Sequence, residues 1–398
     1  MSVDKKRFQS ICVGSSSDKT TTKSHQLPIF ASSSFVFDHA QEGIDIFTGQ
    51  AQGHVYSRYA NPTVDSVAAK IAALEGFDLE EEVFGIMTSS GMSAISGIIM
   101  GLCESGDKIL TQGNLYGGTT ELFAKIFANL GIPPVFTNLS DSSLIREHLE
   151  KDPSIKVIYL ETPANPTMAC LDLEEIAKIA HEYKVTTIVD NTFCTPYLQR
   201  PLSLGIDYVI HSTTKYLNGH GNSIAGIMIG RKDDLYTKIW QVMKLVGTNC
   251  NPWDAWLTNN GLRTLTLRMD RHSSNALGLA QFLEGHQKVN YVNYNGLESH
   301  AFHDIAKKQM SQFGGMLSFE IKGGSAAAIA FMDKLKIATQ APTLGDVDTL
   351  VLHPMTSSHL NVDPELRAAN GITEGLIRLS VGIEDIQDII EDVDQALG

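Results

Sequence analysis

The sequence predicts an α/β protein: a mostly parallel, doubly wound sheet domain followed by a smaller C-terminal α+β domain. From Val83 onward, short apolar runs of strand length alternate with amphipathic segments of helix length, a pattern typical of a parallel sheet with helices on both faces. After about Trp256 this alternation gives way to a long polar helical pattern. We therefore predict an extended N-terminal arm over residues 1–60, a large domain over 61–255 and a small domain over 256–398.

The expected strands of the large domain are Val83–Met87, Lys108–Gln112, Val135–Thr137, Val157–Glu161, Thr186–Asp190, Tyr208–His211 and Ile224–Ile229. The helices expected between them are Met92–Cys103, Thr119–Leu130, Leu144–Glu150 and Leu173–Tyr183. In the last helix, Ile176, Ile179 and Ala180 share one apolar face. Asp172 and Glu175 have the spacing of a capping pair at its start.

The small domain is expected to contain, in order, a helix around Leu267–Leu283, a strand over Gly315–Ile321, a helix over Ala326–Leu335, a strand over Leu376–Val381 and a final helix over Ile386–Leu397. The first 60 residues are rich in Ser, Thr, Gln and Gly and show little periodicity. They therefore predict an arm that reaches a partner subunit rather than a core element.

Composition and charge exclude several classes of protein. Thirty-one Lys plus Arg against 45 Asp plus Glu give a formal charge of -14, which repels nucleic acid and anionic lipid. The longest apolar stretch, Ala94–Leu102, is far shorter than the roughly 20 residues of a membrane span, and the first 25 residues hold no apolar signal core. The five cysteines show no CxxC spacing. We expect a cytoplasmic protein with no metal site and no nucleic-acid or membrane partner.

Polar residues follow the apolar runs at three places, where ligands bind in open α/β sheets. Thr88-Ser89-Ser90-Gly91-Met92 opens a helix, whose free amides favour an anion. Asp190 ends one strand, and Lys215 follows another after the hydroxyl residues Ser212, Thr213 and Thr214. Taken singly, these residues are most simply a helix cap, a turn residue and a surface lysine.

Taken together, the three features match the phosphate, the ring nitrogen and the aldehyde of pyridoxal phosphate. The Asp190 carboxylate would keep the pyridine nitrogen protonated, because an opposite charge favours the charged form of its partner. A lysine in a desolvated site loses proton affinity and becomes a nucleophile, so Lys215 would bond to the aldehyde and later move protons. The residues therefore predict pyridoxal phosphate as the cofactor.

Seven motifs occur in order from about residue 25 to the C-terminus. They are Tyr56-Ser57-Arg58-Tyr59-Ala60-Asn61-Pro62-Thr63, Ser89-Ser90-Gly91-Met92, Leu115-Tyr116-Gly117-Gly118-Thr119, Glu161-Thr162-Pro163-Ala164-Asn165-Pro166, Val189-Asp190-Asn191-Thr192, His211-Ser212-Thr213-Thr214-Lys215-Tyr216 and Ile377-Arg378-Leu379-Ser380-Val381-Gly382. In this order they resemble the Cys/Met-metabolism (trans-sulfuration) branch of the fold-type I PLP transferases, including homoserine-ester sulfhydrylases and methionine γ-lyases.

The resemblance implies roles for the matching positions. The implied catalytic residues are Lys215, Tyr116 and Asp190. The implied cofactor-binding residues are Ser90, Gly91, Met92, Tyr116, Asn165, Asp190, Ser212, Thr214 and Lys215, together with Tyr56 and Arg58 from a neighbouring subunit. The implied substrate-binding residues are Arg378, Asn165, Thr343 and Tyr56; the guanidinium of Arg378 matches an amino-acid carboxylate. The resemblance further implies a homotetramer whose active sites are shared across a dimer.

Secondary positions predict the reaction. Methionine γ-lyases carry a cysteine where this chain has Gly118, and cystathionine enzymes usually place an acid before Ser-Leu-Gly, where this chain has Pro342-Thr343-Leu344-Gly345. The segment His25-Gln26-Leu27-Pro28 lacks the His-Ala-Gly that is common in the lyases. We predict γ-replacement on an O-acyl homoserine by sulfide or a small thiol. The alternative is γ-elimination from methionine or cystathionine, which releases a thiol, 2-oxobutanoate and ammonia; a non-catalytic regulator of the same fold is a remote third reading.

Overall fold

The computed structural model describes residues 6–14, 24–357, 360 and 371–398. Its larger sheet has seven strands in the order β1-β7-β6-β5-β4-β2-β3. Their bounds are β1 (Phe84–Thr88), β2 (Lys108–Thr111), β3 (Pro134–Phe136), β4 (Ile155–Glu161), β5 (Thr186–Asp190), β6 (Tyr208–Ser212) and β7 (Gly226–Gly230). Strands β3, β2, β4, β5 and β6 pair in parallel, while β7 runs antiparallel to both β6 and β1. The predicted mostly parallel sheet is confirmed.

Helices cover both faces of this sheet because its strands are apolar on both sides. In β4, Val157 and Tyr159 pack in one cluster with α4, whereas Ile158 and Leu160 pack in another with α6 and α7. Successive strand side chains point to opposite faces, and full burial of Ile158 or Leu160 contributes about 1.5–3 kcal/mol. The helices are α3 (Pro62–Glu75), α4 (Gly91–Leu102), α5 (Gly117–Glu121), the π-helical η1 (Leu122–Phe127), α6 (Ser142–Lys151), α7 (Leu173–Glu182), α8 (Thr195–Leu198), η2 (Pro201–Leu204), α9 (Lys232–Asp234), η3 (Leu235–Ile239), α10 (Trp240–Val246) and α11 (Pro252–Leu262).

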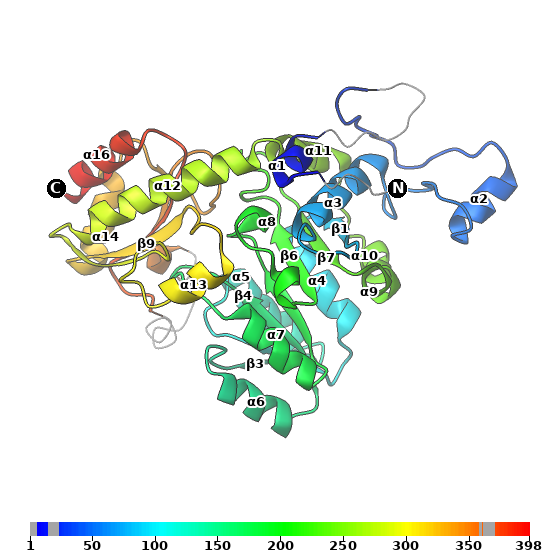
Figure 1. Cartoon of the computed structure of the whole chain (residues 1–398), viewed down its shortest axis with the longest axis horizontal. Coiled ribbons are helices and arrows are strands. Elements are labelled where there is room, and N and C mark those ends of the chain that lie inside the picture. Colours follow the sequence, from blue (N-terminus) through cyan, green and yellow to red (C-terminus); the bar gives the residue numbers. More distant parts are fainter. Residues whose placement is uncertain (1–5, 15–23, 358–359, 361–370) are drawn as a thin grey trace.

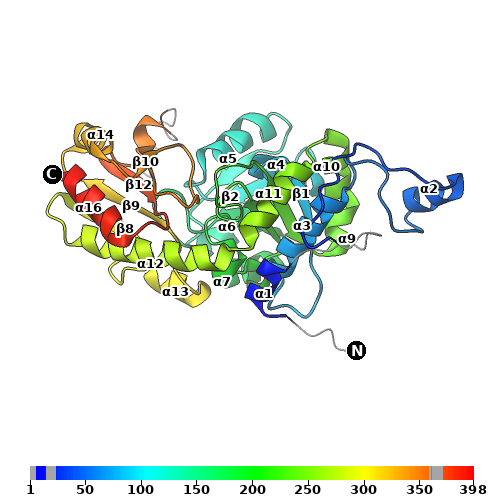
Figure 2. The ribbon, with the colours of Figure 1, turned by 90° about the horizontal axis from the view of Figure 1, so that it is seen from above.

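A second sheet of five strands has the order β10-β11-β12-β9-β8. Its strands are β8 (Val289–Asn293), β9 (Met316–Ile321), β10 (Thr339–Gln340), β11 (Leu350–Leu352) and β12 (Leu376–Ser380). The remaining helical elements are α12 (Leu265–Glu284), α13 (His303–Gln309), α14 (Gly324–Lys334), η4 (Pro354–Thr356) and α16 (Ile386–Leu397). Figures 1 and 2 show this sheet, with α14 and α16, at the opposite end of the molecule from α2 (Ala40–Phe47).

Helix α12 connects the two parts of the molecule (Figure 1). Its first turns place Leu265 and Met269 in the core cluster of the large sheet, while Ala276 and Leu283 belong to the cluster of the second sheet. The predicted boundary after residue 255 falls inside α11, which packs on α3. We therefore propose that the domain boundary lies within α12, because that helix contributes side chains to both cores.

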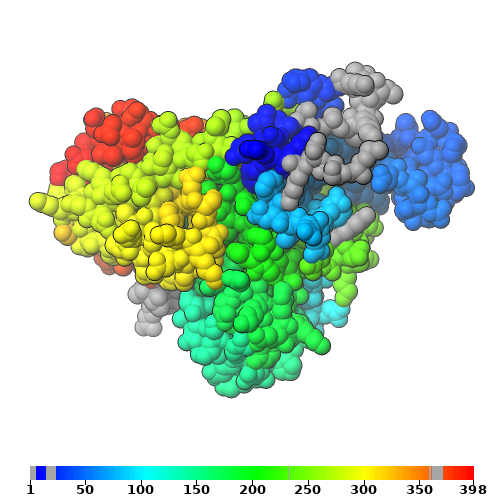
Figure 3. Space-filling model, viewed as in Figure 1, coloured from blue at the N-terminus to red at the C-terminus, as the bar shows by residue number. Residues whose placement is uncertain are grey.

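The expectation that residues 1–60 form an extended arm is wrong for part of that range. Residues 1–5 and 15–23 lie outside the described residues. Helix α1 (Phe8–Val13) buries Phe8 and Cys12 in the large core against α3. Such a short helix buries one face without enough turns to show a period in the sequence. Helix α2 (Ala40–Phe47), by contrast, projects from the body and forms a knob at one end in Figures 1 and 3.

No helix in the part of the chain that the structure describes is long and apolar enough to cross a membrane.

Candidate active site

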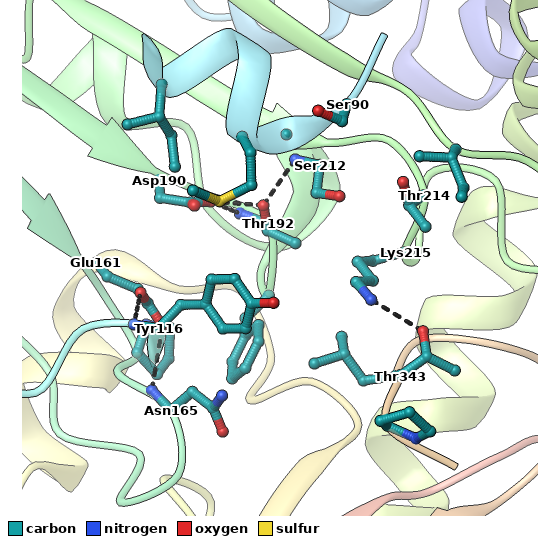
Figure 4. Close-up of a pocket in the computed structure, with 18 of the residues that line it drawn as sticks. Ser90, Tyr116, Glu161, Asn165, Asp190, Thr192, Ser212, Thr214, Lys215 and Thr343 are labelled. Atoms are coloured by element: carbon teal, nitrogen blue, oxygen red, sulfur yellow. Dashed lines mark hydrogen bonds between the residues drawn. The ribbon is translucent and has the colours of Figure 1, made fainter. Parts of the chain in front are cut away.

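One pocket lies where the carboxyl ends of β4, β5 and β6 meet the start of α4 and the second sheet (Figure 4). Its lining residues are Ser90, Gly91, Met92, Ile95, Tyr116, Glu161, Pro163, Asn165, Asp190, Thr192, Phe193, Ser212, Thr214, Lys215, Ile224, Pro342, Thr343, Leu344 and Arg378. The structure therefore brings together the residues that the sequence assigned to the site, with the exception of Tyr56 and Arg58.

The start of α4 forms one wall of the pocket. Ser90 caps the helix: its hydroxyl accepts from the Ser93 N–H at 3.1 Å, and its own N–H donates to the Ser93 hydroxyl at 2.8 Å. The amides of Gly91 and Met92 have no acceptor within the helix, since a helical N–H bonds four residues back. Gly91 must be a glycine, because a Cβ there would lie 2.7 Å from the Cβ of Ser212. This wall can therefore hold an anion against the end of β6.

Asp190 supplies the carboxylate at the end of β5. Its Oδ1 accepts hydrogen bonds from the N–H of Thr192, at 3.0 Å, and from the Thr192 hydroxyl. The Thr192 hydroxyl in turn accepts from the N–H of Ser212 at 2.9 Å. Desolvation raises the pKa of Asp190, and the Thr192 hydrogen bonds and the charge of His211 oppose that rise. Thr192 thus orients the carboxylate and ties it to the strand that leads to Lys215.

The amine of Lys215 lies in a desolvated and positively charged setting. Burial, reinforced by the charge of Arg378, lowers the pKa of Lys215 from 10.5 to about 8. Its Nζ donates a hydrogen bond to Thr343 Oγ1 at 2.9 Å. At pH 7.4 about one fifth of an amine with this pKa is neutral, compared with about one in a thousand at a pKa of 10.5, and the neutral form is the one that attacks a carbonyl carbon.

Two buried polar atoms from lining residues have no hydrogen-bond partner among the described residues: Nε of Arg378 and Oδ1 of Asn165. Buried polar atoms are nearly always paired, so these two mark a place where a ligand supplies the partners. The Arg378 guanidinium is held in place because its Nη2 donates to the carbonyl oxygen of Thr343 at 2.8 Å. A fixed guanidinium suits a carboxylate.

Tyr116 and Arg58 are placed differently. Tyr116 points its ring into the pocket in Figure 4, with nearly half of the residue exposed. Arg58 lies outside the pocket, where its guanidinium stacks over the rings of Tyr59, at 4.9 Å, and Tyr56, at 5.5 Å, and donates to the carbonyl oxygen of Lys244. Tyr56 and Arg58 therefore do not reach Lys215 within one chain.

Sequence reasoning assigned no role to Glu161 or Thr192. Both stand in the motifs quoted above, directly at or after a strand end, so their place next to the pocket could have been inferred. The apolar lining residues, such as Ile95 and Ile224, carry no comparable sequence signal. Their position depends on packing between distant elements.

The groups in the pocket fit pyridoxal phosphate. The start of α4 with Ser212 and Thr214 would hold the phosphate, Asp190 the ring nitrogen, and Lys215 the aldehyde. The unpaired Nε–H of Arg378 would remain for a substrate carboxylate, and the side-chain amide of Asn165, whose NH2 group donates, would remain for the cofactor's oxygen.

Comparison with known proteins agrees with the cofactor that these groups fit. The family model described as Cys/Met metabolism PLP-dependent enzyme matches residues 9–398. L-methionine gamma-lyase of Fusobacterium nucleatum subsp. polymorphum is 43% identical over 373 residues, which cover 93% of each chain. O-succinylhomoserine sulfhydrylase of Pseudomonas aeruginosa is 40% identical, with 98% of this chain and 95% of that chain covered. The solved structure of cystathionine gamma synthase from Xanthomonas oryzae pv. oryzae in complex with cystathionine gives a TM-score of 0.92 at 36% identity, with 98% of both chains covered.

Proposed function

Since this chain belongs to the Cys/Met metabolism family of PLP-dependent enzymes, we propose that it catalyses γ-replacement on an O-acyl homoserine by sulfide or a small thiol. It is a PLP-dependent enzyme of sulfur amino acids. What remains to be proposed is the group that leaves the γ-carbon and the fate of the carbon skeleton afterwards.

The charge inventory of the pocket carries the proposal. Four of the described lining residues are charged, namely Glu161, Asp190, Lys215 and Arg378. Backbone amides hold Glu161, Thr192 holds Asp190, and Thr343 contacts both Lys215 and Arg378. The unpaired Nε of Arg378 is left for the substrate's α-carboxylate. No further charge within this lining remains for a distal ammonium or carboxylate. A neutral γ-substituent, such as an acetyl ester or a methylthio group, therefore fits best.

Gly118 supports replacement over elimination. A Cβ at this position would lie 2.6 Å from Cε1 of the Tyr116 ring, so the glycine allows the ring to lie back over the start of α5. The lyases that this chain resembles carry a cysteine there. We infer that the ring position that Gly118 allows leaves room in the pocket for the incoming thiol.

A second candidate is γ-elimination from methionine, and the identity to methionine γ-lyases favours it. A non-catalytic regulator would be expected to lack part of the site. Because Lys215, Asp190 and the start of α4 all line one pocket, that reading has no support.

The protein's own groups divide the work as follows. When bound, pyridoxal phosphate supplies an electron sink for the carbon that carries the substrate's amino group. Arg378 would bind and orient the substrate carboxylate through its unpaired Nε. Lys215 Nζ would take the α-proton and move a proton at the β-carbon, with the Tyr116 hydroxyl assisting. Asp190 would hold the positive charge at the ring nitrogen throughout.

We further propose a cytoplasmic homotetramer in which Tyr56 and Arg58 complete the phosphate site of a neighbouring subunit. Their position outside the pocket of their own chain supports a role in a second copy. All five cysteines are free and buried, which fits a reducing compartment.

The test offers the purified, cofactor-loaded protein three substrates: methionine alone, O-acetylhomoserine with sulfide, and O-succinylhomoserine with sulfide. Homocysteine and 2-oxobutanoate are measured, with Lys215→Ala as the blank. We expect homocysteine mainly from the acetyl ester, because the described residues that line the pocket within one chain offer a succinyl carboxylate no cation besides Lys215 and Arg378. Rapid 2-oxobutanoate from methionine without homocysteine from either ester would overturn the proposal in favour of elimination.

A further inference from the structure

Glu161, the last residue of β4, joins two loops that each contribute a residue to the pocket lining. Its Oε2 accepts a hydrogen bond from the N–H of Tyr116 at 2.7 Å, and its Oε1 accepts one from the N–H of Asn165 at 3.3 Å (Figure 4). Tyr116 stands directly before α5, and Asn165 lies in the connection from β4 to α7. A single carboxylate thus bridges the β2–α5 loop and the β4–α7 loop.

The anchor of this bridge is itself held rigidly. Glu161 is 6% exposed. Its own N–H donates to Gln112 Oε1 at 3.1 Å, and Gln112 Nε2 donates to the carbonyl oxygen of Glu161 at 2.9 Å. Gln112 Nε2 also donates to Oδ1 of Asn114, two residues before Tyr116. The side chain of Glu161 therefore extends from a fixed backbone and has little freedom to follow a moving loop.

Only a carboxylate can make both contacts. Each oxygen of an ionised carboxylate accepts hydrogen bonds, whereas the amide group of a glutamine offers one acceptor and one donor. Burial and the neighbouring charge of Asp190 raise the pKa of Glu161, and the hydrogen bonds from the Tyr116 and Asn165 amides oppose that rise because they favour the ionised form. Glu161 and Asp190 are paired in register on adjacent strands, so two acids lie side by side at the carboxyl ends of β4 and β5. The repulsion between Glu161 and Asp190 opposes ionisation of Glu161. A neutral glutamine at position 161 would avoid this repulsion, but its side chain would hold only one of the two loops.

We infer that Glu161 is a positioning residue, whose carboxylate fixes the Tyr116 backbone to the Asn165 backbone and thereby sets where the Tyr116 ring and the Asn165 amide stand in the pocket. The inference rests on the proposed function only where it gives Tyr116 a part in proton transfer and Asn165 a part in cofactor binding. The tether itself is a property of the protein without substrate.

The experiment uses Glu161→Gln and measures hydrogen–deuterium exchange of the cofactor-free protein in peptides that cover residues 113–121 and 162–169. We expect exchange at least about fivefold faster in one of these segments, since a lost hydrogen bond to a charged group is worth about 1.5–3 kcal/mol. Peptides from β9 should be unchanged. The matched control is Glu121→Gln, an exposed acid on α5 that pairs with Lys125, and it should exchange as the parent protein does.

The loaded protein supplies the second readout. We expect kcat to fall about tenfold to a hundredfold in Glu161→Gln, since a misplacement of about 1 Å costs this much, with a smaller change in KM and an altered visible spectrum of the bound cofactor. Unchanged exchange in both segments of a folded Glu161→Gln protein would overturn the inference. If that variant does not fold, Glu161→Asp replaces it, because the shorter side chain keeps the charge but cannot reach both amides; unchanged exchange there overturns the inference equally. The exchange result does not depend on which reaction the enzyme catalyses.

Discussion

Thr343 Oγ1 accepts a hydrogen bond from Lys215 Nζ at 2.9 Å, and this contact links the two sheets of the molecule at the reactive amine. Lys215 follows β6 of the large sheet, whereas Thr343 lies between β10 and β11 of the second sheet. The carbonyl oxygen of the same threonine accepts from Arg378. One residue thus holds both the proposed nucleophile and the proposed carboxylate-binding group.

Capture of pyridoxal phosphate by the cofactor-free protein should depend on pH with a midpoint near 8. Burial and Arg378 lower the pKa of Lys215 to about 8, so the neutral amine is lost as pH falls through 8 and dominates above it. Stopped-flow absorbance of the bound cofactor measures the rate at each pH. The Lys215→Ala variant should not develop the absorbance band of the bound cofactor. A midpoint near the ordinary lysine value of 10.5 would contradict the assignment.

Thr343→Val should shift this midpoint downward by about half a unit to one unit, which corresponds to one hydrogen bond. The hydroxyl oxygen favours the charged form of Lys215, and valine removes the acceptor at nearly constant volume. Thr343→Ser retains an oxygen and should restore the parent midpoint. The same titration of the three proteins is the measurement, and equal midpoints for valine and threonine would show that the contact has no energetic role.

Gly91→Ala should weaken cofactor binding by about tenfold to a hundredfold. The added Cβ would lie 2.7 Å from the Cβ of Ser212, and overpacking of this kind costs about 1–3 kcal/mol. Equilibrium titration of the cofactor-free protein gives the dissociation constant. The control is Gly285→Ala, where the nearest atom to the new Cβ is 3.8 Å away; its affinity should be unchanged.

Mixing inactive subunits should restore activity if Arg58 acts across a dimer. A hybrid dimer has one Arg58→Ala chain and one Lys215→Ala chain. One of its two sites then combines an intact Lys215 with an intact Arg58 from the other chain, and the second site lacks both side chains. Random pairing of equal amounts then gives about one quarter of the parent activity, since half of the two-fold dimers are hybrids. Activity of the mixture is measured after co-refolding, and no recovery would place Arg58 in its own chain's site.

The parts of the fold that the sequence predicted well have local causes. Strand β4 contains the apolar run Val157–Leu160, and α7 is capped by Asp172, whose side chain accepts from the N–H of Glu175. Helix α3 was not predicted, although Asn61 caps it and Pro62 occupies its first turn. Strands β10 and β11 were not predicted either, because they have two and three residues and are too short to show a period.

The sequence by itself determined that Lys215, Asp190 and Gly91 lie at or just after a strand end or at a helix start, because neighbouring residues define those elements. Only the tertiary structure decided that Thr343 contacts Lys215, 128 residues away, and that Glu161 contacts Tyr116, 45 residues away. Such contacts depend on how β2 pairs with β4 and how the second sheet packs against the first. Hydrophobic patterns specify which face of an element is buried, but the partner that each side chain meets is settled when those faces pack together.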